Sequence, residues 1–139
     1  MIRLFTALSL PETIRSRLQN FRGGVPGAKW TAPENYHLTL RYIGDVDQGV
    51  AQDIDLALSE VRARAISIEL AGVGYFGKGA KARILWVGVT PCDELNHLHT
   101  KVDAALAPMG VLTGSRRFSP HVTIARLKRP DPARLDAFV

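Results

Sequence analysis

The sequence predicts one domain of alternating strands and helices, arranged as two similar α/β lobes. The chain has 139 residues, enough for one compact domain with a core, and its 46% hydrophobic and 22% charged residues are typical of a folded soluble protein. A strand that leads to a proline and a helix occurs twice, beginning at Arg3 and Arg83, an offset of 80 (83 − 3). A His-x-Thr segment also occurs twice, beginning at His37 and His121, an offset of 84 (121 − 37). The alternative is a chance likeness between two common strand–helix units.

The elements of the first half follow from local pattern. Residues 3–9 alternate and are rich in apolar side chains, which predicts a strand. A helix follows, because Pro11 suits a first turn and apolar residues then recur at helical spacing until Gly23. Residues 28–30 form a short extended segment, and residues 36–43 are typical of a strand.

The second half repeats this kind of pattern. An apolar stripe predicts a helix over residues 50–64. Residues 66–75 and 83–89 are expected to be strands, followed by a helix over residues 94–107. Residues 117–127 are the last clear strand.

Charge and cysteine content narrow the class of protein. The chain has 18 Lys and Arg against 13 Asp and Glu, a net charge of +5, and a positive field attracts phosphorylated ligands. A basic protein with no special partner fits the charge equally well. The lone cysteine, Cys92, excludes an intramolecular disulfide and favours a reducing compartment. No signal peptide or bilayer-spanning run is present, so we expect a cytoplasmic monomer with no membrane partner.

The two His-x-Thr segments carry the candidate catalytic residues. Side chains alternate between the faces of a strand, so His37 shares a face with Thr39, and His121 shares a face with Thr123. If a two-fold axis relates the lobes, these polar faces meet across a groove. Two imidazoles and two hydroxyls then converge on one site.

Such a site is suited to phosphoryl transfer to water. The pKa of an unperturbed imidazole is roughly 6.5, so a neutral and a protonated histidine coexist near neutral pH. One accepts a proton from water, the other donates one to the leaving oxygen, and the hydroxyls hold the phosphate oxygens. A single His-x-Thr is more often structural, but two copies on matching strands favour catalysis.

The sequence indicates neither a metal site nor a cofactor. His97 and His99 lie two residues apart in a segment of helical periodicity, so they point in different directions and we expect a solvated helix face. No zinc-ligand spacing or carboxylate cluster occurs, and the Gly-rich segment at Lys78 lacks the P-loop pattern.

Five stretches of the chain match one known family in sequence and in order. They are residues 3–11 (RLFTALSLP), Trp30 with residues 33–40 (PENYHLTL), 42–45 (YIGD), 85–88 (LWVG) and 118–126 (FSPHVTIAR). As a set they resemble the LigT-like RNA 2′,3′-cyclic phosphodiesterases, or 2′-5′ RNA ligases, of the two-histidine (2H) phosphoesterase superfamily. The set spans nearly the whole chain and is far more specific than either His-x-Thr.

The resemblance implies a bilobal α+β fold with two antiparallel sheets around a central groove, helices outside and a pseudo-two-fold internal repeat. It implies hydrolysis of a terminal 2′,3′-cyclic phosphate to a 2′-phosphomonoester without metal or nucleotide cofactor, and its reversal as 2′-5′ RNA ligation. The partners would be RNA with 2′,3′-cyclic phosphate ends, such as tRNA fragments, or nucleoside 2′,3′-cyclic phosphates.

The resemblance also assigns roles to residues. Catalysis falls to His37 and His121, and phosphate binding to Thr39, Thr123 and Arg126. The family favours His121 as the base, although the residues alone assign neither role. Simple alternation places Arg126 on the face opposite His121, so Arg126 reaches the site only if the strand twists, bulges or ends there.

One departure from the family concerns the C-terminus. The family continues well beyond the second motif, whereas this chain ends at Val139, and residues 131–139 indicate a linker and the start of another element. We therefore expect a single LigT-like 2H domain over residues 1–139 that lacks the C-terminal part usual in the family.

Two other functions remain open. The same site would serve a 2H phosphodiesterase acting on another cyclic phosphate, such as an ADP-ribose derivative, and the groove alone would serve a non-catalytic RNA-binding module. Tyr36 and Phe118 are candidates for base stacking, although alternation favours core packing. The basic residues around the second motif extend the groove or form a solvated rim; they are Arg116, Arg117, Lys128 and Arg129.

Overall fold

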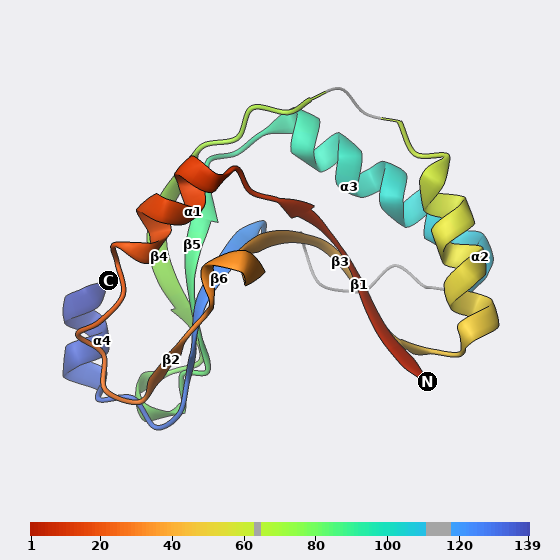
Figure 1. Cartoon of the computed structure of the whole chain (residues 1–139). Coiled ribbons are helices and arrows are strands. Elements are labelled where there is room, and N and C mark those ends of the chain that lie inside the picture. The colour runs from red at the N-terminus through yellow and green to blue at the C-terminus, as the bar shows by residue number, and fades with distance from the viewer. Residues whose placement is uncertain (63–64, 111–117) are drawn as a thin grey trace. The chain divides into compact units, whose positions relative to one another are not determined.

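The computed structural model of the chain describes residues 1–62, 65–110 and 118–139 (Figure 1). In chain order the elements are β1 (Ile2–Ser9), α1 (Glu12–Gln19), β2 (Ala28–Trp30), η1 (Pro33–Asn35), β3 (His37–Val46), α2 (Gln48–Ser59), β4 (Leu70–Phe76), η2 (Gly79–Lys81), β5 (Ile84–Val89), α3 (Asp93–Leu106), η3 (Ala107–Met109), β6 (His121–Leu127) and α4 (Pro132–Phe138), where η marks a short 3-10 helix. None of the described helices is long and apolar enough to cross a membrane.

The strands among the described residues form one six-stranded sheet in the order β1-β3-β6-β5-β4, with β2 also paired to β6. The described registers of β2, β3, β4, β5 and β6 are all antiparallel. The α+β prediction is therefore confirmed. The prediction of two sheets is wrong, because the strands that carry the two His-x-Thr motifs pair directly with each other. The groove and the pseudo-two-fold repeat stay predictions.

The chain divides into two compact units, and the division falls within β3, between Leu38 and Thr39. Unit 1 comprises Met1–Ala7, Thr39–Glu69 and Thr90–Pro120, and unit 2 comprises Leu8–Leu38, Leu70–Val89 and His121–Val139. Each unit has its own set of buried side chains.

In unit 2, one face of the strands builds a hydrophobic core, and we call it the core face. Leu38 on β3 pairs with Val122 on β6, and both are fully buried. Paired residues of antiparallel strands point to the same face, and residues two apart along a strand share it. Leu85 on β5 follows the same alternation and is also fully buried.

Helix α4 packs against strands β2 and β4 of unit 2 (Figure 1). Leu135 is fully buried, and the ring of Phe138 lies 5.7 Å from that of Trp30. The Tyr75 hydroxyl donates a hydrogen bond of 2.9 Å to the Asp136 carboxylate. Residues 132–138 therefore form a short helix, α4, where the sequence indicated a linker and the start of an element.

In unit 1, helices α2 and α3 supply most of the buried side chains. Helix α2 begins at Asp47, whose carboxylate accepts a hydrogen bond of 2.8 Å from the backbone N–H of Val50 and so caps the first turn. The buried side chains of the two helices are Ile54, Leu95, Leu98, Val102 and Leu106. The helical spacing predicted for residues 94–107 is thus confirmed in α3, whereas in α2 the buried side chain is Ile54.

Element boundaries differ from the predictions where periodicity is weak. The helix expected over residues 50–64 ends at Ser59, and the strand expected from residue 66 begins at Leu70. Within the described residues, β6 begins at His121, directly after Pro120. Proline has no N–H to donate to a sheet, which explains this start; residue 117 lies outside the described residues.

Candidate active site

The pairing of β3 with β6 places the two histidines on one face of unit 2. Because Leu38 and Val122 point into the core, their neighbours His37, His121 and Thr123 point to the opposite face, which we call the site face. All three side chains are partly buried. The histidines predicted from sequence are therefore brought to the same surface.

The same register sets the spacing of these polar side chains. If the antiparallel register of the Leu38–Val122 pair is continued by one residue, His37 is opposite Thr123, and His121 is the diagonal neighbour of His37. Directly opposite side chains lie roughly 4.5–5.5 Å apart at Cβ, and diagonal neighbours about 7–8 Å. Two imidazoles at this separation leave space for a phosphate between them.

An aromatic wall lies beside His121. The ring of Phe76 meets the imidazole edge-on, with centroids 5.1 Å apart, and the indole of Trp86 lies 6.2 Å away. Trp86 pairs with Gly74 on β4, and a Cβ at Gly74 would come within 2.5 Å of the indole. The indole therefore lies across a position that has no side chain, and the wall limits how far the imidazole can turn.

A β-bulge in β6 decides where Arg126 lies. Thr123 pairs with Trp86, but the preceding residue of β5 pairs with Ala125, so Ile124 is an extra residue in β6. Ile124 and Ala125 are both buried, and alternation resumes with Arg126 exposed on the site face. From the sequence, we expected Arg126 to reach the site only if the strand twists, bulges or ends there. The structure has such a bulge.

Thr39 follows His37 by two residues on β3 and is partly buried, so both side chains share one face of that strand. Thr39 belongs to unit 1, whereas His37, His121, Thr123 and Arg126 belong to unit 2. Its role in binding phosphate stays a prediction.

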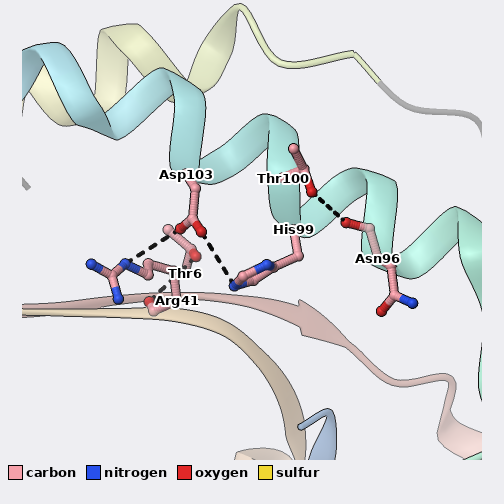
Figure 2. Close-up of polar contacts among 6 residues, drawn as sticks. All are labelled: Thr6, Arg41, Asn96, His99, Thr100 and Asp103. Carbon is pink, nitrogen blue, oxygen red and sulfur yellow. Dashed lines mark hydrogen bonds and ion pairs between the residues drawn. The ribbon is translucent and has the colours of Figure 1, made fainter. Parts of the chain in front are cut away.

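A second polar cluster lies in unit 1 between β3 and α3 (Figure 2). The Asp103 carboxylate lies 3.4 Å from Nε of Arg41 and 3.7 Å from Nε2 of His99. The Thr6 hydroxyl donates a hydrogen bond of 3.4 Å to the backbone carbonyl of Arg41. Phe118 stacks on the His99 ring at 3.9 Å and 8°. These contacts join β1, β3 and α3.

This cluster corrects the interpretation of His99. We expected His97 and His99 on a solvated helix face, and His97 is indeed exposed. The His99 side chain is 20% exposed and lies between an aromatic ring and a carboxylate. Sequence reasoning missed Arg41 and Asp103, because they are distant along the chain and no local pattern links them.

Tyr36 packs in the core, as alternation indicated. Its side chain is buried, and burial raises the pKa of its hydroxyl, against a smaller opposing effect of Arg22. That hydroxyl has no hydrogen-bond partner among the described residues. Tyr36 is therefore not available to stack on a base.

The remaining candidates are exposed or lie outside the described residues. Lys128 and Arg129 are exposed, whereas Arg116 and Arg117 fall in the segment that the structure does not describe. Across the described ranges, no group of three or more His, Cys, Asp and Glu side chains could hold a metal ion.

Comparison with known proteins places this geometry in a family. A relative from Aeropyrum pernix, named RNA 2′,3′-cyclic phosphodiesterase, is 41% identical over 106 residues, which cover 76% of this chain and 60% of the relative. One of the same name from Archaeoglobus fulgidus is 33% identical over 138 residues, covering 97% of this chain and 78% of the relative. The chain thus spans about three fifths to three quarters of these proteins.

Solved structures agree with the sequence comparison. The crystal structure of Escherichia coli LigT complexed with 3′-AMP matches with a TM-score of 0.76 and 26% identity, over 94% of this chain and 75% of that one. The model of the 2′-5′ RNA ligase superfamily matches residues 10–138. The chain therefore belongs to the 2′-5′ RNA ligase superfamily.

Proposed function

We propose that the chain is an RNA 2′,3′-cyclic phosphodiesterase, which opens a terminal 2′,3′-cyclic phosphate to a 2′-phosphomonoester. The pairing of Leu38 with Val122 carries this proposal, because it makes His37 and His121 diagonal neighbours on the site face. Two further findings support it. The relatives above carry that name, and E. coli LigT has been solved with a nucleotide and with phosphate.

In the proposed reaction, each histidine carries out one proton transfer. His121 accepts a proton from water while the water oxygen attacks phosphorus, and the bond from phosphorus to the ribose 3′-oxygen breaks. His37 donates a proton to that 3′-oxygen as it leaves. The products are a 2′-phosphomonoester and a free 3′-hydroxyl, and the two histidines finish with their protonation states exchanged. With a 5′-hydroxyl in place of water, attack on phosphorus and loss of the 3′-oxygen form a 2′-5′ linkage, and the reverse of that step regenerates the cyclic phosphate and the 5′-hydroxyl.

Three further residues would hold the phosphate. The Thr123 hydroxyl, opposite His37, donates to a nonbridging oxygen, and Thr39 does so from β3. The Arg126 guanidinium, brought to the site face by the bulge, neutralises the negative charge. Holding phosphorus in line between base and acid removes orientational freedom before reaction.

Hydrolysis of a nucleoside 2′,3′-cyclic phosphate in EDTA tests the proposal. We expect turnover by the wild type, no loss with EDTA, and a bell-shaped pH dependence, because one histidine must be neutral and the other protonated. His37→Ala and His121→Ala should each lower kcat by about 10²–10⁴-fold. The matched control is His97→Ala, which removes an exposed imidazole on α3 and should leave kcat unchanged.

Other outcomes would indicate a different function or mechanism. Absence of turnover with any cyclic phosphate, together with tight RNA binding, would make it a binding module. Turnover of a cyclic ADP-ribose-type phosphate alone would keep the histidine chemistry and change the substrate. Loss of activity in EDTA would contradict the metal-free mechanism.

A further inference from the structure

The positive charge of the chain is concentrated in one unit. Unit 2 contains 11 Lys and Arg and four Asp and Glu, a net charge of +7 (11 − 4), whereas unit 1 contains seven and nine, a net charge of −2 (7 − 9). The whole positive excess therefore lies on the unit that carries both catalytic histidines.

The acidic residues of unit 2 all lie off its strands. Asp131 caps α4 by accepting from the backbone N–H of Ala133, and Asp136 accepts from Tyr75. The other two are at the start of α1 and in η1. Strands β2, β4, β5 and β6 carry no carboxylate at all.

Two cations face each other on the site face without a counter-ion. Lys29 on β2 pairs directly with Arg126 on β6, and both are exposed. Like charges directly opposite each other on a sheet are destabilising. No ion pair of either side chain occurs within the described ranges. A bound phosphodiester would offset the repulsion between these two positive charges by accepting charge-assisted hydrogen bonds from both side chains.

The position of this pair relative to the histidines indicates which phosphate it binds. β3 and β2 both run antiparallel to β6, with Leu38 opposite Val122 and Lys29 opposite Arg126. Arg126 is three residues beyond Thr123, about 10 Å at a rise of ~3.3 Å per residue. The long side chains of lysine and arginine close part of that distance. Lys29, on the neighbouring strand, is therefore too far from Thr123 to share the reacting phosphate and near enough to reach the next one, whereas the long side chain of Arg126 extends towards both.

We propose that Lys29, together with Arg126, binds the internucleotide phosphate on the 5′ side of the terminal ribose. Arg126 lies between the two phosphates, and Lys29 contacts the outer one. The pair makes the enzyme select RNA ends over free cyclic mononucleotides. The kinetic test of this inference rests on the proposed function, whereas the binding test below does not depend on it.

The kinetic test compares two substrates that differ by one phosphodiester. They are a nucleoside 2′,3′-cyclic phosphate with a free 5′-hydroxyl and a dinucleotide with the same cyclic end. In Lys29→Gln, the ratio of kcat/KM for the dinucleotide to that for the mononucleotide should fall roughly tenfold, through KM. Lys29→Arg should restore most of the ratio. Arg17→Gln, which removes an exposed cation from α1, is the control and should preserve it.

A binding test does not require turnover. Fluorescence anisotropy of a short RNA that ends in a 3′-phosphate is measured over a salt series. Lys29→Gln should weaken binding and reduce the slope of log K against log[salt] by about 0.7, the value for one phosphate contact on a single strand.

The two tests separate the two proposals. The wild type could prove inactive on cyclic phosphates and still bind RNA with a salt dependence that is reduced in Lys29→Gln. That outcome would refute the proposed function and support the phosphate site. An active wild type whose substrate ratio and salt slope are the same in Lys29→Gln would overturn the phosphate site and keep the phosphodiesterase. Equal losses on both substrates would also overturn it, because Lys29 would then act on the reacting phosphate or on the fold.

Discussion

Gly74→Ala tests whether the indole of Trp86 lies where the structure places it. A Cβ at Gly74 would come within 2.5 Å of Cζ2 and 2.6 Å of Cη2 of Trp86, distances that real Cβ atoms do not show. The backbone of Gly74 does not have a positive φ, so the substitution probes this steric contact and not backbone strain. The indole must therefore move, and it is half of the aromatic wall beside His121.

The expected magnitude follows from two opposing effects. Overpacking costs about 1–3 kcal/mol, and replacing a strand glycine by alanine gains about 0.5–1 kcal/mol. The net loss of unfolding free energy should thus be about 0.5–2 kcal/mol. In a Trp86→Leu background the clash is gone, so Gly74→Ala should stabilise by about 0.5–1 kcal/mol. The coupling free energy in the double-mutant cycle is then about 1–3 kcal/mol.

Urea unfolding of the four proteins in the cycle measures this coupling. Gly49→Ala on α2 is the control, because a Cβ there meets Asp47 at an ordinary 3.4 Å, and its effect should be additive with Trp86→Leu. The kcat of Gly74→Ala should also fall, since a displaced indole changes the surroundings of the His121 imidazole. A coupling free energy below about 0.5 kcal/mol would refute the reasoning. Substitutions whose effects on stability are additive to that extent are not at residues in contact.

Substitutions at three other residues give further tests. Asp103→Asn should lower unfolding free energy by about 1–2 kcal/mol, because it leaves the mostly buried Arg41 and His99 without their carboxylate; a change within 0.5 kcal/mol in urea would contradict this. Tyr36→Phe should be neutral or stabilise by up to about 1 kcal/mol at pH 7, because no described group bonds the buried hydroxyl. Burial raises the pKa of Tyr36 in the native state, so stability should fall as pH rises from about 10, where unfolded tyrosine ionises, towards the native pKa; Tyr36→Phe should remove that part of the slope in thermal melts. Thr123→Val should lower kcat/KM for a cyclic phosphate and Thr123→Ser should retain most of it, whereas equal rates for the two variants would show that the hydroxyl does not act.

Much of the fold follows from local periodicity. The helical spacing of Leu95, Leu98 and Val102 predicted α3, which spans Asp93–Leu106. Strand alternation likewise placed Leu38 and Val122 in the core and the histidines opposite them. These predictions succeeded because burial of one face is a property of each element alone. Pairing between strands depends on the whole chain, so the expectation of two sheets was wrong.

The site was predicted less completely, for the same physical reason. The histidines and threonines appear in the sequence as two short motifs, each on one strand. The wall of Phe76 and Trp86 depends on which strands are neighbours, and the Asp103 cluster joins a helix to a strand far away in sequence. Neither leaves a local pattern, although a glycine opposite a tryptophan becomes informative once the strand pairing is known.

The bulge at Ile124 shows why core and site must be considered together. Ala125 pairs with Trp30, and Leu127 pairs with Ala28, so Ala125 and Leu127 point to the core face. Ala125 is fully buried and Leu127 is almost fully buried. Without the extra residue, alternation from Thr123 would turn Ala125 and Leu127 to the site face and Arg126 into the core. An unpaired charge in the core is far more costly than an unpaired residue in a strand. The same inserted residue therefore keeps the core face of β6 apolar where β6 pairs with β2, and it brings Arg126, opposite Lys29, to the face that carries the histidines.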